Sequence, residues 1–120
     1  MSKTLLFVYG TLKRGHQSNH LLAGAEFVRA AQTMPVYRLY GVGWHPGLVI
    51  DRANGLAVQG ELWAVDDDTL ARLDEYEGVP HYFARDHVAV ADQVGDIHAY
   101  FFAGPIPVDA PAGDRWPFPV

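Results

Sequence analysis

The 120-residue chain contains no cysteine. Disulfides, thiolate nucleophiles, cysteine-ligated zinc and iron–sulfur clusters are therefore excluded. Positive charge is also scarce, because nine Lys and Arg stand against fourteen Asp and Glu, for a net charge of −5 at pH 7. No basic run is longer than Lys13-Arg14. Nucleic-acid-binding domains normally present a basic face, so this composition argues against a nucleic-acid partner.

Long hydrophobic runs are absent as well. The apolar stretch in "MSKTLLFVYG" is far too short for a membrane span or a signal peptide. We therefore expect a cytoplasmic protein without a membrane partner. The length is that of one domain, and 49% hydrophobic residues suffice for a core without covalent staples. The sequence predicts a single domain over residues 1–120.

The hydrophobic pattern predicts about six strands and two short helices. Extended segments are expected at residues 4–10, 26–34, in broken pieces within 36–50, and at 55–65, 82–92 and 95–104. Regular β–α alternation is absent, which favours an α+β fold with a barrel-like sheet over a doubly wound nucleotide fold. Five of the eight prolines follow Gly104. Residues 1–104 should therefore form the barrel and helices, and 105–120 an extended, irregular tail.

Two segments carry helix signals. Ser18 is a candidate N-cap for a short helix through Leu22. The stronger signal is "DDDTLARLDEYEG", in which three acids at 66–68 suit the positive end of a helix. Gly78 suits the position just beyond its C-terminus. The pattern predicts the best helix of the chain at this place.

Glu77 stands out within that helix. With Leu70 at 0° and about 100° per residue, Leu73 falls at about 300° and Glu77 at about 340°. Glu75, at about 140°, should face water. Burial and the negative end of the helix dipole would both raise the pKa of an inward-facing Glu77 towards neutrality, where a carboxylate can accept and return a proton. The alternative is a frayed last turn, with Glu77 in solvent or paired with Arg85 or Lys13.

A second candidate is the turn in "FVYGTLKRG". A buried strand that ends in Gly followed by a small polar residue can direct several backbone N–H groups to one point, where they bind an anion or a developing oxyanion. The turn is not a P-loop, because G-x-x-x-x-G-K-[ST] is missing. An ordinary strand-ending turn is the alternative.

Other constellations are weaker. His16 and His20 could share a helix face as metal ligands, but no third ligand is evident, and no metal is expected. Asp74 and Glu77, one turn apart, are poorly placed to flank a sugar ring. No G-x-S-x-G elbow supports a triad built on Ser18. Four aromatic side chains could line a pocket, although core packing is their commoner role: Tyr37, Tyr40, Trp44 and Trp63.

Four motifs occur in order between about residues 5 and 102. They are Tyr9-Gly10-Thr11-Leu12, Gly60-Glu61-Leu62-Trp63, Asp74-Glu75-Tyr76-Glu77 and Tyr82-Phe83-Ala84-Arg85. In order and spacing they resemble the gamma-glutamylcyclotransferase superfamily, and within it the gamma-glutamylamine cyclotransferase branch. Leu62-Trp63 stands where Val-Tyr is more usual. Residues 26–55 match only loosely, so the resemblance leaves the substrate's identity open.

The resemblance implies a small mixed β-barrel with flanking short helices and a cavity at its mouth. It implies cleavage of a small γ-glutamyl amide by the substrate's own α-amine, which releases 5-oxoproline and a free amine without a cofactor. Glu77 would be the general acid/base. The turn of Tyr9, Gly10, Thr11 and Leu12 would hold the glutamyl end, and Tyr82 and Arg85 would be pocket or support residues. A non-catalytic binder of a γ-glutamyl or pyroglutamate-like metabolite, or a related acyl-transfer or hydrolytic enzyme, remains an alternative. The oligomeric state stays open.

Overall fold

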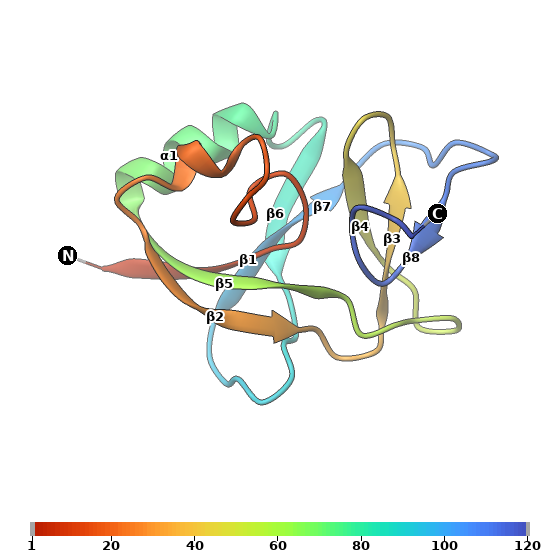
Figure 1. The fold of residues 1–120 in the computed structure, drawn as a ribbon, viewed down its shortest axis with the longest axis horizontal. Coiled ribbons are helices and arrows are strands. Elements are labelled where there is room, and N and C mark those ends of the chain that lie inside the picture. The colour runs from red at the N-terminus through yellow and green to blue at the C-terminus, as the bar shows by residue number, and fades with distance from the viewer. Residues whose placement is uncertain (1, 120) are drawn as a thin grey trace.

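The computed structural model describes residues 2–119, and its strands form one mixed sheet (Figure 1). The strands are β1 (Lys3–Val8), β2 (Glu26–Gln32), β3 (Tyr37–Gly41), β4 (Pro46–Ile50), β5 (Gln59–Asp66), β6 (Phe83–His87), β7 (Ile97–Phe102) and β8 (Ala112–Gly113). Their order is β2-β5-β1-β7-β4-β3-β8, with β6 paired to β7. One α-helix, α1 (Asp67–Tyr76), and a 3₁₀ segment, η1 (Asn19–Leu22), accompany the sheet.

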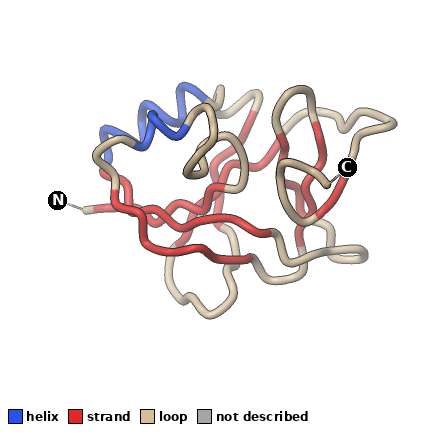
Figure 2. The backbone as a smooth tube through the Cα atoms, viewed as in Figure 1, coloured by secondary structure: helices blue, strands red, loops and turns tan. Residues whose placement is uncertain are grey.

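The sheet, in which β1 lies between β5 and β7, curls into a half-barrel. This strand pairs antiparallel with β5 over its whole length and parallel with the start of β7, while β7 also pairs with β4 and β6. An isolated bridge between Thr33 and Val90 joins the chain beyond β2 to the chain beyond β6, so the two borders of the curl meet. Figure 2 shows the long strands and wide loops of this curl, with α1 lying along one side. The predicted α+β fold with a small mixed barrel is confirmed.

Apolar side chains are buried on both faces of β1, which explains its uninterrupted hydrophobic run. Phe7 belongs to the cluster that includes Leu48 and Leu62, on the inside of the curl. Leu6, its neighbour, belongs to the cluster that includes Leu73 of α1. The extended segment predicted at residues 55–65 contains β5, which likewise contributes side chains to both clusters. Both faces of β1 are thus fixed by packing.

Helix α1 has the ends that its sequence predicts. The Asp66 carboxylate accepts a hydrogen bond from the Thr69 N–H at 2.8 Å. At the other end Gly78 adopts φ +70°, its N–H donates to the Glu75 carbonyl, and the Val79 N–H donates to the Asp74 carbonyl. This pair of bonds is a Schellman motif, for which a left-handed glycine is preferred. The helix therefore ends at Tyr76, with Glu77 as its C-cap directly before Gly78.

The helix expected at residues 18–22 needs a correction. The segment is a single 3₁₀ turn, and Ser18 makes no side-chain capping bond. Its hydroxyl instead lies 2.7 Å from the Tyr76 hydroxyl, on the last turn of α1. The short segment therefore packs beside the helix C-terminus through a contact between residues far apart in the chain.

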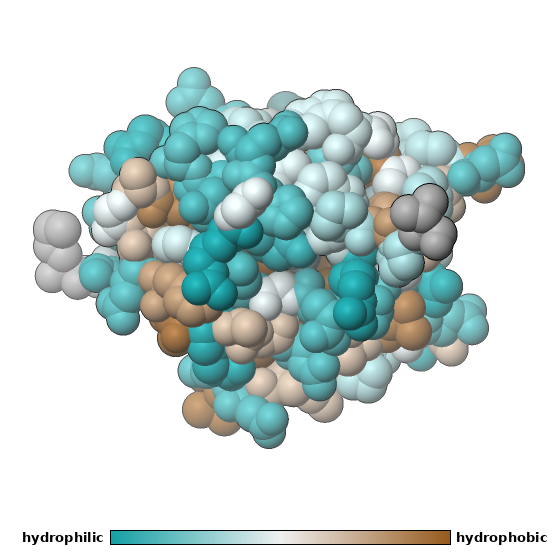
Figure 3. All heavy atoms as spheres, in the orientation of Figure 1, coloured by the Kyte–Doolittle hydropathy of each residue, from teal (hydrophilic) through white to brown (hydrophobic). Residues whose placement is uncertain are grey.

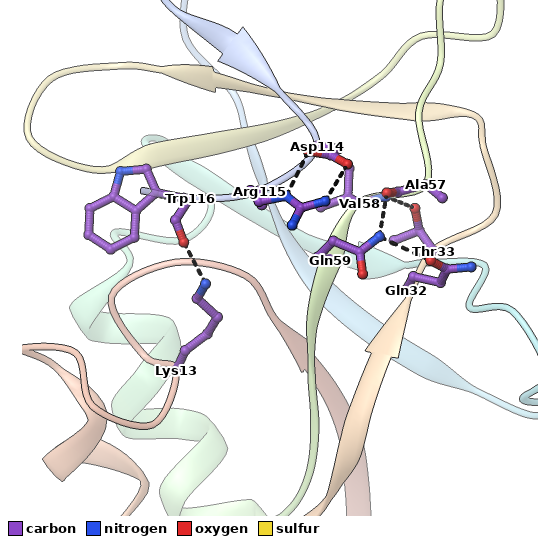
Figure 4. Close-up of polar contacts among 9 residues, drawn as sticks. All are labelled: Lys13, Gln32, Thr33, Ala57, Val58, Gln59, Asp114, Arg115 and Trp116. Carbon is purple, nitrogen blue, oxygen red and sulfur yellow. Dashed lines mark hydrogen bonds and ion pairs between the residues drawn. The ribbon is translucent and has the colours of Figure 1, made fainter. Parts of the chain in front are cut away.

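The proline-rich tail is more ordered than its composition predicts. Strand β8 pairs with β3, and the Gln59 N–H donates to the Asp114 carbonyl at 2.7 Å. Trp116 and Phe118 pack against the inner cluster of their own chain. Figure 4 shows the Lys13 ammonium reaching the Trp116 carbonyl, at 2.5 Å. The tail is thereby attached to the segment that follows β1.

The outer surface is chemically mixed. In the view of Figure 3, hydrophilic residues cover most of the face, with hydrophobic ones scattered between them. Within residues 2–119, no helix has the length and apolar character that a bilayer crossing requires.

Candidate active site

A cavity of about 130 Å³ opens where the ends of β1 and α1 meet the start of β4. Its lining includes the turn residues Gly10, Thr11 and Leu12, the helix-end residues Tyr76 and Glu77, and the residues Trp44, His45 and Tyr82. Inner side chains complete it: Phe7, Val8, Tyr9, Pro46, Phe83 and Tyr100. The structure thus brings the two candidate sites of the sequence, the turn and Glu77, into one cavity.

The turn after β1 presents backbone N–H groups. Its carbonyls are occupied, since those of Gly10, Thr11 and Leu12 accept from Lys13, Ser18 and the Asn19 amide. The three N–H groups of the same residues donate to no protein acceptor within residues 2–119. A Cβ on Gly10 would lie 2.8 Å from Cγ of Pro46, so glycine is needed for β4 to approach this closely. A turn with free N–H groups beside a cavity can bind an anion.

Glu77 lines the cavity from the end of α1. The side chain is half-buried, and this burial raises the pKa of its carboxyl from 4.5 to about 7. Neither cation considered as a partner reaches it, because Lys13 donates to the Trp116 carbonyl and Arg85 pairs with Asp74. Glu75 is exposed. The inward orientation predicted for Glu77 is confirmed.

Tyr9 holds strands together at the base of the cavity. Its hydroxyl donates to the Tyr100 carbonyl at 2.6 Å and accepts from the Leu48 N–H at 3.2 Å. Burial, and next the charge of Glu77, raise the pKa of this phenol well above its usual value. The neutral hydroxyl therefore joins β1 to β4 and β7 and has no remaining proton to donate.

Arg85 lies behind the cavity rather than in its lining. Its guanidinium grips the Asp74 carboxylate through Nε at 2.8 Å and Nη2 at 3.1 Å. The hydrogen bond to Asp74 raises the pKa of Arg85. The Tyr100 hydroxyl donates to the same carboxylate at 2.7 Å; burial first, and then this bond, raises the pKa of Tyr100. The clamp of Asp74, Arg85 and Tyr100 fixes the last turn of the helix that carries Glu77.

Comparison with known proteins identifies the family of the chain. A sequence model described as "Gamma-glutamyl cyclotransferase, AIG2-like" matches residues 6–117. The chain belongs to this family.

Individual relatives of the family agree with this assignment. A Vibrio cholerae protein, provisionally named gamma-glutamylcyclotransferase, is 38% identical over 96 residues, which cover 80% of this chain and 81% of that protein. Human gamma-glutamylaminecyclotransferase is 38% identical over 88 residues, which cover 68% of this chain and 58% of the human protein. This chain thus matches little more than half of the human protein's length. The crystal structure of a mouse AIG2-like protein superposes with a TM-score of 0.86 at 25% identity, covering 97% of this chain and 89% of that chain.

The sequence did not single out several residues of this cyclotransferase-like cavity. Tyr76 and Tyr100 line it, as does His45, whose Nε2 lies 3.1 Å from the Tyr82 hydroxyl. Trp44 is the one of the four weighed aromatics that lines the cavity; Tyr37 and Trp63 are buried in the core, and Tyr40 is outside the lining. The motif "GWHP" could have pointed to the segment at 43–46, but its family match was too loose.

Of the two histidines weighed as metal ligands, His16 packs on the Trp116 ring, and Nδ1 of His20 lies 3.1 Å from the Gln17 carbonyl. A different cluster, His87, Asp96 and His98, brings its ligand atoms within 4.8 Å of one another. Nδ1 of His98 lies 2.6 Å from Nη1 of Arg85, which can only donate, so this nitrogen carries the lone pair. Nε2 of His98 then carries the proton and donates to Asp96 at 3.1 Å. The contacts of Asp96 with the two histidines explain why these three side chains lie close together.

Proposed function

We propose that the protein is a gamma-glutamylamine cyclotransferase that converts a γ-glutamyl amide into 5-oxoproline and a free amine. The observation that carries the proposal is the meeting of Glu77, with a pKa of about 7, and the free N–H groups of residues 10–12 in one cavity. Family membership supports it, as does the name of the human relative, a gamma-glutamylaminecyclotransferase.

The proposed reaction needs no nucleophile from the protein. The substrate's α-amino nitrogen attacks its own γ-carbonyl carbon, a C–N bond forms, and the ring closes. The original amide C–N bond then breaks and the amine leaves. Glu77 takes the proton from the attacking nitrogen and returns it to the leaving nitrogen, so protons balance and nothing is oxidised or reduced.

The free N–H groups of Gly10, Thr11 and Leu12 would bind the negative charge of the substrate. Either the α-carboxylate or the oxyanion that develops on the γ-carbonyl suits a turn of this kind. Holding the bent substrate with its amine against its carbonyl lowers the barrier further, because the two reacting groups no longer need to find each other. Tyr82 contributes to the wall of the cavity, and Arg85 acts only through Asp74.

The test is mass spectrometry of a panel of γ-glutamyl amines incubated with the protein, with 5-oxoproline as the readout. The wild-type protein should release 5-oxoproline without added metal or cofactor, whereas Glu77→Gln, which keeps the size but cannot exchange the proton, should release none. Circular dichroism should show an unchanged fold, and Glu75→Gln, two positions away on the exposed face, should keep full activity.

Three results would contradict the proposal. Binding of 5-oxoproline without turnover of any panel member would make the protein a metabolite binder. Full activity in Glu77→Gln would remove the assigned acid/base. Incorporation of oxygen from labelled water into the product would instead indicate a hydrolase.

A further inference from the structure

We propose that His87, Asp96 and His98, here called the β6–β7 cluster, bind a divalent transition metal such as Zn²⁺, and that the bound ion lowers the activity by withdrawing His98 from Arg85. None of the three residues is in the lining of the cavity. The metal site itself does not depend on the proposed function, whereas its effect on activity does. The inference depends on where the donor atoms lie, where His98 carries its proton, and how His98 is connected to the end of α1.

Strand pairing brings the three donor atoms of the cluster together. His87 and His98 lie opposite one another in the antiparallel pair of β6 and β7, with ring centroids 5.0 Å apart. Asp96 comes directly before β7, and its carboxylate reaches both rings. Oδ1 of Asp96 lies 2.6 Å from Nδ1 of His87 and 3.1 Å from Nε2 of His98. Two imidazole nitrogens and one carboxylate oxygen therefore converge from positions that the sheet fixes.

This donor set suits zinc, nickel or copper rather than magnesium or calcium, which prefer oxygen ligands. Zinc lies about 2.0 to 2.2 Å from such donors, so in a tetrahedral site the donor atoms are about 3.3 Å apart. The three donor atoms already lie within 4.8 Å of one another. Side-chain rotation can supply the difference, because the side chains of His87 and Asp96 are 72% and 66% exposed. The same exposure leaves room for water as the fourth ligand.

The proton of His98 makes metal binding and the contact with Arg85 mutually exclusive. Nδ1 of His98 accepts from Nη1 of Arg85 at 2.6 Å, so the ring proton is on Nε2. A metal ion on Nε2 displaces that proton, and the neutral imidazole then carries its proton on Nδ1. The Nδ1–H group would face the Arg85 donor, so the hydrogen bond between them must break. The proton of His87 meets no such obstacle, because its ring is exposed and its other nitrogen can carry it.

Arg85 connects this event to the proposed acid/base. Its guanidinium also holds Asp74, which lies on the last turn of α1 directly before the Glu77 C-cap. Loss of the bond from Nη1 to His98 removes one of the contacts that fix the guanidinium, and the charge of the ion repels it. The helix end that carries Glu77 is then held less firmly. The coupling is reciprocal for binding, so the intact contact between Arg85 and His98 must weaken the affinity for the metal.

Isothermal titration calorimetry with Zn²⁺ tests the site without any substrate. The wild-type protein should bind one equivalent, and Mg²⁺ should not bind. His87→Gln should weaken zinc binding at least about tenfold, since even the loss of a residue that only supports a ligand costs that much. Arg85→Leu should tighten it about 5- to 150-fold, the usual range of coupling between two sites. His20→Gln is the matched control, because His20 is an exposed histidine outside the cluster.

Nitrogen NMR of the histidine rings and the 5-oxoproline assay test the coupling. Zinc should move the His98 proton from Nε2 to Nδ1. Saturating Zn²⁺ should lower kcat about 2- to 30-fold with little change in KM, because the ion binds outside the lining. A chelator should restore the rate. His87→Gln should lose this inhibition and His20→Gln should keep it, each compared with its own rate without zinc.

The outcomes separate this inference from the proposed function. Equal zinc affinity in the wild type and in His87→Gln would overturn the metal site, because the ion would then bind elsewhere. Zinc binding that leaves the His98 proton on Nε2, or that leaves kcat unchanged, would overturn the coupling to the helix end. Absence of 5-oxoproline from every substrate would overturn the cyclotransferase function, while calorimetry and NMR would still decide whether the β6–β7 cluster binds the metal.

Discussion

At the scale of single residues, two carboxylates one turn apart on the same helix meet opposite surroundings. Asp74 is held by a guanidinium and by a tyrosine hydroxyl. Glu77 lines the cavity, and burial alone accounts for the rise in its pKa. A carboxylate held in a fixed ion pair is a poor proton carrier, whereas one with a pKa near neutrality can both accept and release a proton. The division of roles follows from what surrounds each side chain.

The pKa of Glu77 predicts the acid limb of the pH profile. The carboxylate is the form that takes the proton, so activity is present above the pKa and is lost as the pH falls through about 7. Below that value kcat/KM should fall about tenfold per pH unit. An exposed glutamate would place the limb near 4.5, the ordinary value. Rates of 5-oxoproline release between pH 4.5 and 9 distinguish the two, and a flat profile down to pH 5.5 would contradict the assignment.

Arg85 is expected to act as a positioning residue. Arg85→Leu leaves the Asp74 carboxylate without its cation, which should lower the free energy of unfolding by about 1 to 3 kcal/mol, since both side chains are about three-quarters buried. The last turn of α1 should loosen, so kcat should fall about tenfold, while KM changes little because Arg85 is outside the lining.

Arg115 provides the matched control for that substitution. It holds Asp114 through the same two nitrogens at 3.1 Å each, but on the surface. Arg115→Leu should change neither stability nor kcat noticeably. If Arg85→Leu lowers the unfolding midpoint but leaves kcat intact, the clamp stabilises the fold without positioning Glu77.

At the scale of elements, the end of α1 decides where Glu77 lies. Gly78→Ala places an L-residue at φ +70° and brings its Cβ to 3.0 Å from Cβ of Tyr82. We expect a loss of about 1 to 2 kcal/mol in unfolding free energy. Because the Schellman motif sets the direction in which the Glu77 side chain points, activity should fall at least about fivefold as well. Thermal unfolding and the 5-oxoproline assay measure the two effects.

Gly24→Ala separates backbone strain from the effect on the site. Gly24 has φ +87°, and an added Cβ would meet nothing within 4 Å. This variant should lose similar stability and keep its activity. Equal losses of activity in both variants would show that general destabilisation, rather than the helix end, is responsible.

The elements that sequence reasoning could predict are those set by local signals. The helix contains its N-cap, a C-terminal glycine and a hydrophobic pattern with a period of 3.6 residues. The inward orientation of the Glu77 side chain can therefore be predicted from residues 66–78 alone. Arg85 is different, because its hydrogen-bond partners Asp74 and His98 lie 11 and 13 positions away on other elements. The local sequence predicts Ser18 as an N-cap, whereas the hydrogen-bond partner of its hydroxyl in the structure is Tyr76, 58 positions away. Contacts of this kind depend on how strands pair, which no local pattern states.

At the scale of the whole molecule, the cavity is a product of strand order. The parallel pairing of β7 with both β1 and β4 brings Tyr100 and Pro46 beside the turn that ends β1. The motifs and the general fold are recognisable in the sequence, yet the part of the cavity formed by residues 44–46 is not, because that loop reaches the cavity only through this pairing. The tail adds a further long-range contact, from Trp116 back to Lys13 and His16.

That contact predicts that the tail supports the turn proposed to bind the substrate. Trp116 packs on His16, with ring centroids 5.3 Å apart, and on the inner core cluster. Trp116→Ala should lower the free energy of unfolding by about 2 kcal/mol, less than for a fully buried tryptophan because the residue is only half-buried. The segment after Gly10 would lose its lateral support, so KM should rise several-fold with kcat nearly unchanged. Val108→Ala, on a fully exposed part of the same tail, should alter neither quantity. A lower unfolding midpoint with an unchanged KM would restrict the tail to a stabilising role, because the turn would then keep its geometry without Trp116.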